Sequence, residues 1–394
     1  TFKIIENENT EDVKYKTYSC LDYSFKGIIT LTYLDYKPGL YFPDVHKMYE
    51  TAFEPVKTAL GAEPEYMHDS VLKEYKCRDY KIIASDGSTL FARYILRGSR
   101  LYILSASSKN PLNSTDVFKR FSYFHFISPL KPELQSFTPD EKDFTVMMPG
   151  IVKQETDSSK NEVSYSYVAR DPYTSNWFEV YSHRFSGYDY LKNDSIIFNY
   201  FKNYAATYND SLVDSSRAVN GNIKMYNFKF ARNTNTDILK KVRAVINGRH
   251  FYLLIAINDK VNANDSINEN LFNSFKVSQP DLSFDIFAPK SAILLKSLQS
   301  SDTTEFKSAS GALKEYDFEK SDIPQLITTL KANFADDTDD YNTRYFIYNR
   351  LYALMDSVQK IDFIKNNYAS MPDSGIVRMN ALRVLANIQS KESI

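Results

Sequence analysis

The sequence predicts an α+β protein: two repeated α/β sandwich units, each built on an antiparallel sheet, precede an all-α domain of helical hairpins. The first observation behind this prediction is an internal repeat with a period of about 150 residues. The second is the alternation of apolar and polar residues in each copy, beside one helical pattern. The third is a change after Pro280 to apolar residues at helical spacing. The predicted domains are therefore 1–130, 131–280 and 281–394.

The internal repeat is clearest where residues 93–106 align with residues 243–256 without a gap. Identical residues stand at five equivalent positions: Arg93/Arg243, Gly98/Gly248, Tyr102/Tyr252, Leu104/Leu254 and Ala106/Ala256. Further along the chain, residues 121–124 match residues 272–275. Matches in this order indicate that the second unit is a duplicate of the first.

Each copy has the same predicted order of elements. Alternating apolar residues predict a strand at 27–33 and at 176–182, and a helical pattern follows at 44–60 and 194–208. Further strands are predicted at 75–84 and 91–96, and at 224–231 and 241–246. Polar breaks with Gly98 and Gly248 predict hairpin turns, and a short helix at 116–123 or 265–274 closes each copy. The first copy lacks a counterpart of 137–149, which would fall before Thr1, so we expect an N-terminally truncated unit.

Five or six short helices are predicted in the last domain. Their apolar positions fall within 306–313, 323–334, 345–355, 361–368 and 376–388. Asp302 suits a helix N-cap, with Glu305 at the capping-box position. Pro324 suits a first helical turn, where its missing N–H costs nothing. Brief polar connectors then predict stacked helical hairpins, which usually present a concave docking surface.

Charge and hydropathy exclude two classes of protein. With 48 Lys+Arg against 49 Asp+Glu, the chain lacks the basic excess of a dedicated nucleic-acid binder. Its longest strongly apolar run, 251–257, is far shorter than the ~20 residues that span a bilayer. The two cysteines, Cys20 and Cys77, cannot form a four-ligand metal site, which leaves two free thiols or a single disulfide.

Sequence motifs of the common enzyme classes do not occur in the chain. It has no glycine-rich phosphate loop, no GxSxG elbow, no HExxH pair and no CxxC pair. The acidic loop Asp336–Asp340 has four carboxylates, which suit Ca²⁺, but it departs from the EF-hand pattern. Capping of the next helix is the favoured interpretation of this loop. The sequence therefore predicts no catalytic residue, no cofactor and no resident metal.

Five residues are candidate contacts to a ligand or partner: Arg93, Arg243, Trp177, Tyr188 and Tyr190. Each arginine is followed nine residues later by a tyrosine, so each pair is either an anion site or an arginine stem packed across a sheet. Trp177, the single tryptophan, suits either an anchor for a partner or core packing. Tyr188 and Tyr190 are expected in an exposed loop.

The two repeated units resemble the PsbP-like α/β sandwich family. The resemblance is carried by residues 98–104 (GSRLYIL) and 248–254 (GRHFYLL), together with 144–150 (FTVMMPG). The helical tail resembles HEAT repeats at 330–337 (LKANFADD). The combination is similar to C-terminal regions of large envelope proteins of Bacteroidota, some of them TraB/GumN-like, which implies a bacterial envelope or periplasmic location. The PsbP-like resemblance implies binding or assembly support and transfers no active-site residue.

These observations favour a non-enzymatic binding or scaffold module, part of a larger bacterial protein, with a protein partner. Two alternatives stay open. One is an accessory or regulatory fragment of a hydrolase whose active site lies outside this chain, and the other is a small-ligand binder using a cleft between the α/β units. An enzyme predicts a pocket lined by several titratable groups, whereas a scaffold predicts a groove or patch of Tyr and Phe.

Overall fold

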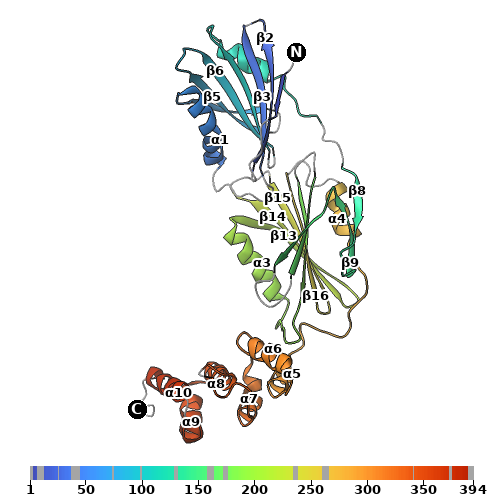
Figure 1. The fold of residues 1–394 in the computed structure, drawn as a ribbon, viewed down its shortest axis with the longest axis vertical. Helices are drawn as coiled ribbons and strands as arrows, with labels where there is room; N and C mark the ends of the chain where they lie inside the picture. The colour runs from blue at the N-terminus through green and yellow to red at the C-terminus, as the bar shows by residue number, and fades with distance from the viewer. Residues whose placement is uncertain are drawn as a thin grey trace. The chain divides into compact units, whose positions relative to one another are not determined.

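The computed structural model describes residues 3–6, 13–24, 26–36, 45–72, 75–97, 100–127, 132–157, 164–171, 176–233, 238–259, 266–339, 341–371 and 375–388. The chain forms two compact units, one of Thr1–Arg184 with Ile197–Leu282 and one of Phe185–Ile196 with Ser283–Ile394. The first holds two antiparallel seven-stranded sheets and the second is helical (Figure 1). The predicted α+β class is confirmed. Gly98, Asp44, Asp265, Asp340, Thr1 and 391–394, on which predictions were made, lie outside the described residues.

The first sheet has the strand order β1-β2-β3-β7-β6-β5-β4, with every neighbouring pair antiparallel. Its strands are β1 (Lys3–Glu6), β2 (Val13–Asp22), β3 (Gly27–Tyr36), β4 (Glu65–Leu72), β5 (Tyr75–Ile83), β6 (Thr89–Arg97) and β7 (Arg100–Ser108). Helix α1 (Val45–Leu60) packs Met48 and Phe53 against one face, with Tyr94 fully buried beneath it. Helix α2 (Ser114–Phe121) packs Val117 and Phe121 against the other face.

The second sheet repeats this order strand for strand, as β10-β11-β12-β16-β15-β14-β13. Its strands are β10 (Lys153–Asp157), β11 (Ser164–Arg170), β12 (Trp177–Arg184), β13 (Asp210–Asn220), β14 (Ile223–Arg232), β15 (Ile238–Asn247) and β16 (His250–Asp259). Helix α3 (Ser195–Thr207) lies on one face, and α4 (Ser266–Ser274) lies on the other (Figure 1). The strands and helices predicted in the two copies agree with these bounds to within three residues.

Beside α4, the second sheet carries a small three-stranded sheet of order β17-β9-β8. Its strands are β8 (Leu134–Phe137), β9 (Phe144–Pro149) and β17 (Lys276–Val277). Phe144, Val146 and Met148 of β9 are at most 1% exposed, because they face the large sheet. The second α/β unit is therefore a sandwich of two sheets plus helices.

The helical unit contains α5 (Ser291–Ser297), α6 (Thr303–Leu313), η1 (Lys320–Asp322), α7 (Ile323–Thr329), α8 (Thr343–Leu354), α9 (Ser357–Asn367), η2 (Tyr368–Ser370) and α10 (Gly375–Ile388). It also contains residues 185–196, which the sequence prediction groups with 131–280. Helix α7 is shorter than the predicted 323–334, because Arg344 takes the carbonyl oxygens of Leu330 and Ala332 as hydrogen-bond acceptors.

The predicted N-cap of α6 is confirmed. The Asp302 carboxylate accepts hydrogen bonds from the backbone N–H groups of Thr304 and Glu305. The reciprocal half of the predicted capping box is wrong, because the Glu305 carboxylate accepts from the hydroxyls of Ser297 and Ser300 instead. These two hydrogen bonds hold the pKa of Glu305 below its ordinary value.

Candidate protein-binding face

The face of the first sheet that carries α2 is incompletely covered. Directly paired residues of β2, β3 and β7 share this face, and six of them form what we call the open face: Tyr18, Cys20, Ile29, Leu31, Tyr33 and Tyr102. Each of the six is half-buried. The three tyrosines form a row, with ring centroids 6.3 Å apart from Tyr18 to Tyr33 and from Tyr33 to Tyr102. An aromatic and aliphatic surface of this kind is thus partly exposed to solvent.

The same positions of the second sheet are closed. Tyr252 is equivalent to Tyr102. The pairing registers then give the equivalents of the other five open-face residues, in the order Tyr18, Cys20, Ile29, Leu31 and Tyr33, as Tyr167, Ala169, Phe178, Val180 and Ser182. Tyr252 and the first four of these are at most 1% exposed, and Ser182 is 8% exposed. Burial on this scale stabilises by roughly 1.5–3 kcal/mol for each large side chain. The side chains on this face are therefore half-buried in the first copy and buried in the second, although the two sheets have the same strand order.

Strand β9 closes the face in the second unit. The ring of Phe144 lies 5.6 Å from that of Tyr167 and 5.5 Å from that of Tyr252. Strand β17, which follows α4, pairs with β9 and completes the layer together with Phe275, whose ring lies 5.3 Å from Tyr252. The cover is therefore a β-hairpin, β8 with β9, joined to a short strand that follows the helix.

The first α/β unit has a segment equivalent to β17, and no strand of the described residues pairs with it. After α2, Phe124 and Phe126 place their rings 6.2 Å and 4.8 Å from that of Tyr102, as Phe275 does against Tyr252. Within the described ranges no strand pairs with residues 124–126. The open face thus ends at residues 125–126, which no strand of the described residues pairs with, beside apolar side chains that a hairpin would bury. The backbone N–H of Phe124 donates to the carbonyl of Phe121.

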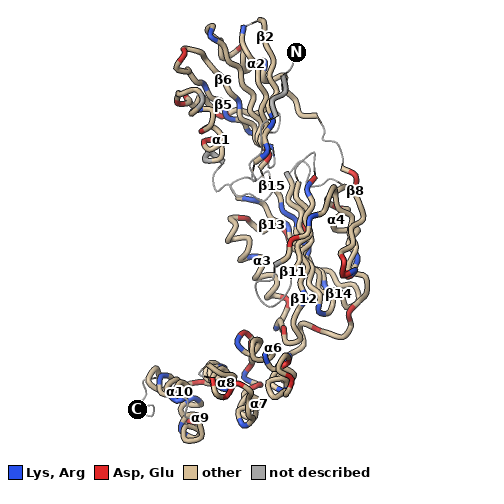
Figure 2. The backbone as a smooth tube through the Cα atoms, viewed as in Figure 1, with Lys and Arg blue, Asp and Glu red and all other residues tan. Residues whose placement is uncertain are grey.

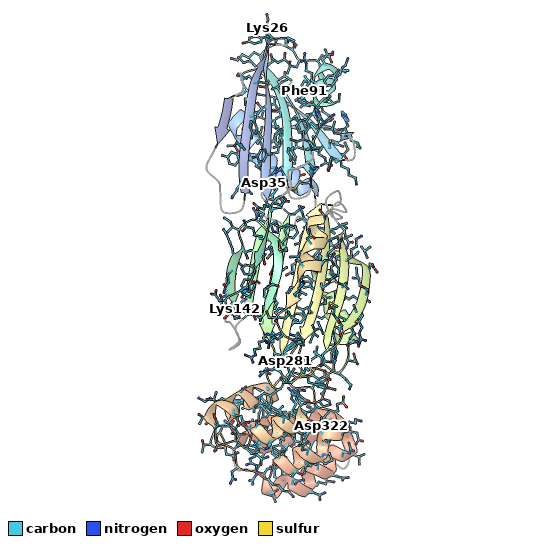
Figure 3. The ribbon with its side chains drawn as sticks, turned by 90° about the vertical axis from the view of Figure 1, so that its right-hand side faces the viewer. Lys26, Asp35, Phe91, Lys142, Asp281 and Asp322 are labelled. Atoms are coloured by element: carbon cyan, nitrogen blue, oxygen red, sulfur yellow. The ribbon has the colours of Figure 1, made fainter. Side chains whose placement is uncertain are left out.

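Charged groups at the rim of the open face are paired. Arg100 forms an ion pair with Asp35, which is labelled in Figure 3, and its guanidinium lies 4.7 Å above the ring of Tyr33. Burial opposes the charge on Arg100, but the bond to Asp35 outweighs it and raises the pKa of the guanidinium. Along the whole described chain, Figure 2 shows residues of both charge signs interspersed.

Both cysteines are free thiols, so the disulfide alternative is wrong. Cys20 lies on the open face and is half-buried, whereas Cys77 is 2% exposed beneath α2. Burial raises the pKa of the Cys77 thiol to about 11. Only the thiolate reacts with alkylating agents, so Cys20 is the thiol suited to chemical labelling.

The structure does not bring the five candidate contact residues into one site. Arg93 is buried and forms a bidentate ion pair with Asp79, and Arg243 is half-buried in the other copy. Trp177 lies on β12, and its indole N–H donates to Glu179 on the same strand.

Tyr188 and Tyr190 belong to the helical unit. Tyr188 is 9% exposed within its core, which corrects the expectation of an exposed loop for this residue. Tyr190 is half-buried and stacks on Tyr316, with ring centroids 5.8 Å apart. These two tyrosines therefore contribute to packing.

The acidic loop makes capping contacts. Asp336 accepts from the backbone N–H and the hydroxyl of Thr343 at the start of α8, and Asp337 forms an ion pair with Arg344. No group of three or more His, Cys, Asp or Glu side chains in the described part of the chain is arranged to hold a metal ion. One Ser–His contact occurs, from Ser164 Oγ to His183 Nδ1 at 3.1 Å, but Ser164 is buried and also accepts from Tyr181.

Comparisons with known proteins define no family for this chain. No family model matches it, and no curated protein matches it. The solution structure of cyanobacterial PsbP (CyanoP) from Synechocystis aligns with 39% of this chain and 98% of its own, at 11% identity and a TM-score of 0.31. A crystal structure from Bacteroides thetaiotaomicron aligns with 59% of this chain and 78% of its own, at 11% identity and a TM-score of 0.24.

The immunity protein TplEi of Pseudomonas aeruginosa, in complex with a peptide, aligns with 68% of this chain and 92% of its own. Its identity is 10% and its TM-score is 0.23. At these scores the alignments carry no argument about what this chain binds. The HEAT-like and envelope resemblances stay predictions. No helix among the described residues is both long and apolar enough to cross a membrane.

Proposed function

We propose that this chain is a non-catalytic protein-binding module, and that the open face of its first α/β unit receives a β-hairpin from a protein partner. One observation carries the proposal: the hairpin of β8 and β9 closes this face in the second α/β unit, whereas no strand of the described residues covers the open face of the first. The partner hairpin would pair one strand with residues 125–126, the counterparts of β17, and place alternate apolar side chains on Tyr18, Leu31 and Tyr33. Main-chain hydrogen bonds supply affinity in this mode, and the side-chain pockets supply specificity.

The chain's own closing hairpin provides a probe. A peptide of residues 132–151 carries the three β9 side chains Phe144, Val146 and Met148, and a matched peptide with serine at these three positions is the control. The assay measures the rate at which iodoacetamide alkylates Cys20 in the full chain, read by mass spectrometry. We expect the probe peptide to slow alkylation of Cys20 and the serine peptide to leave it unchanged. Cys77 serves as an internal reference, since burial raises its pKa to about 11.

Two variants of β3 locate the binding surface. Tyr33→Lys places a charge on the open face, whereas Ile28→Lys places one on the opposite face of the same strand, where Ile28 is already 43% exposed. Protection of Cys20 should be lost in Tyr33→Lys and retained in Ile28→Lys. Equal protection in both variants, or none in the unaltered chain, would contradict the proposal.

The docking role predicted for the helical array, and the hydrolase alternative, stay predictions. The small-ligand alternative placed its site between the α/β units. A cavity within the second α/β unit is a separate candidate for a small-molecule site.

A further inference from the structure

A cavity of about 310 Å³ lies in the second α/β unit, lined by residues of β13, β14, β15 and α4. This volume is at the lower end of the range of small-molecule sites. The guanidinium of Arg243 lies 5.3 Å from the ring of Phe272, which is the apolar side chain of this lining on the same face of the sheet. Phe228 and Val242 pair on the other face, where Phe228 packs on Phe201 of α3. The site thus combines a half-buried cation with one aromatic ring and otherwise polar side chains.

In the first α/β unit, Arg93 is equivalent to Arg243, and its guanidinium has both a carboxylate partner and an aromatic cover. Asp79 stands directly opposite Arg93 in the strand register and accepts two hydrogen bonds of 2.8 Å from its guanidinium. Phe118 of α2 covers the arginine, with the guanidinium 5.1 Å from its ring, and in turn contacts Phe91, which is labelled in Figure 3. Burial opposes the charge of Arg93, but the bond to Asp79 outweighs it and raises the pKa. The side chains of Asp79 and Phe118 thus fill the space around the Arg93 guanidinium.

Two replacements open the same site in the second unit. Asn227, a neutral amide, stands opposite Arg243 in the register. Glu269 stands where α2 has Phe118, since residues 121–124 match 272–275. Glu269 forms its ion pair with Lys241, at 2.8 Å, and so leaves the space above the arginine.

Arg243 consequently keeps unused donors. It donates to Asn227 Oδ1 at 2.7 Å and to the carbonyl of Phe272 at 2.5 Å, which uses two of its five N–H groups. No carboxylate of the described residues lies within 4 Å of its nitrogens, whereas Arg93 has a bidentate one. Burial lowers the pKa of Arg243, and the charge of Glu269 opposes that shift only in part.

We propose that this cavity is a binding site for a small monoanionic carboxylate, held by the free N–H groups of Arg243. The amide oxygen of Asn227 takes the place beside Arg243 that Asp79 has beside Arg93, so the carboxylate binds the N–H groups that Asn227 and the Phe272 carbonyl leave unused. Three cations line the cavity, Lys229, Lys241 and Arg243, against the carboxylates of Asp214 and Glu269. This excess of one positive charge matches a single negative charge rather than a phosphate dianion.

Benzoate is the probe, benzamide is its neutral analogue of the same shape, and inorganic phosphate tests the dianion. Binding to the full chain is measured by isothermal titration calorimetry. We expect saturable binding of benzoate, with benzamide and phosphate at least about tenfold weaker, because the guanidinium selects a planar monoanion.

Asn227→Asp is the decisive variant, since it gives Arg243 the carboxylate partner that Arg93 already has in this fold. It should weaken benzoate binding at least tenfold while leaving the chain folded, and Arg243→Met should do the same. Lys202→Met removes one positive charge from the exposed surface of α3 and is the matched control, for which no change is expected. Unchanged benzoate affinity in Asn227→Asp, tighter binding of phosphate, or no binding of benzoate would overturn the assignment. The protein-binding proposal stands or falls separately, because its assay reads Cys20 in the other copy.

Discussion

Lys240 should make the second sheet more stable as the pH rises above neutrality. Its side chain is 9% exposed on β15, its ammonium lies 4.2 Å from the ring centre of Tyr204, and it donates to that tyrosine's hydroxyl at 3.1 Å. No carboxylate of the described residues lies within 4 Å of it to form an ion pair. Burial therefore lowers the pKa of Lys240 to about 8, although the charges of Asp210 and Glu179 partly oppose the shift.

The sign of the effect follows from proton binding. An unfolded chain keeps the lysine protonated up to its ordinary pKa of 10.5, whereas the folded chain releases the proton near pH 8. Between these two pH values the unfolded state binds more protons, so the free energy of unfolding rises with pH. From pH 7 to pH 10 the gain is about 2 to 3 kcal/mol, because the two states differ by about one proton over roughly two pH units, each of which contributes about 1.36 kcal/mol.

Lys240→Met removes the titrating group and keeps an unbranched side chain. The equivalent position of the first sheet holds Leu90, so an apolar residue fits there. Urea unfolding at pH 7, 8, 9 and 10 is followed by the fluorescence of Trp177, the single tryptophan, which lies in the same sheet. The unaltered chain should gain stability relative to Lys240→Met across this range, and the exposed control Lys202→Met should show no such trend. Parallel curves for the unaltered chain and Lys240→Met would refute the reasoning.

Three further substitutions test the packing. Asp79→Asn leaves a buried arginine without its carboxylate and should cost about 3–5 kcal/mol, seen as faster amide hydrogen exchange in β5 and β6; unchanged exchange would contradict the role of the ion pair. Gly248→Ala should destabilise the β15–β16 turn by about 1–3 kcal/mol, because Gly248 has φ +57° and a Cβ there would lie 2.3 Å from the Asp281 side chain. Gly221→Ala, with φ +60° and open space around it, is the control and should cost less in the same Trp177 assay. Asp302→Ala should lower the stability of the helical unit by about 1 kcal/mol in thermal unfolding, and no change would argue against the cap.

Local sequence patterns predicted the ranges of strands β3, β5, β6, β12, β14 and β15, because alternate residues of a strand face different environments. Residues 91–96 and 241–246 alternate between two buried faces, and Gly248 marks the turn that only a positive φ permits. The large-sheet strands β1, β2, β4, β10, β11 and β13 were not predicted. Of these, β13 is an edge strand exposed along nearly its whole length, so it carries no alternation.

Such patterns did not predict which hydrophobic core a loop residue joins. Tyr188 follows β12 in the sequence but is buried with the helices. An aromatic residue in a loop has no periodicity, so nothing local indicates which hydrophobic core it joins.

The sequence alone predicted the α+β class, an internal repeat, six strands and the helices beside them, because these depend on the local spacing of apolar residues and on turn chemistry. The tertiary structure alone decided how the two copies differ. Whether the face around Tyr33 is covered depends on a hairpin that is distant in the sequence from the strands it covers. Whether Arg243 has a carboxylate partner depends on which residue the register places opposite it on another strand. Cover and charge compensation are properties of neighbours in space, and a linear pattern does not record them.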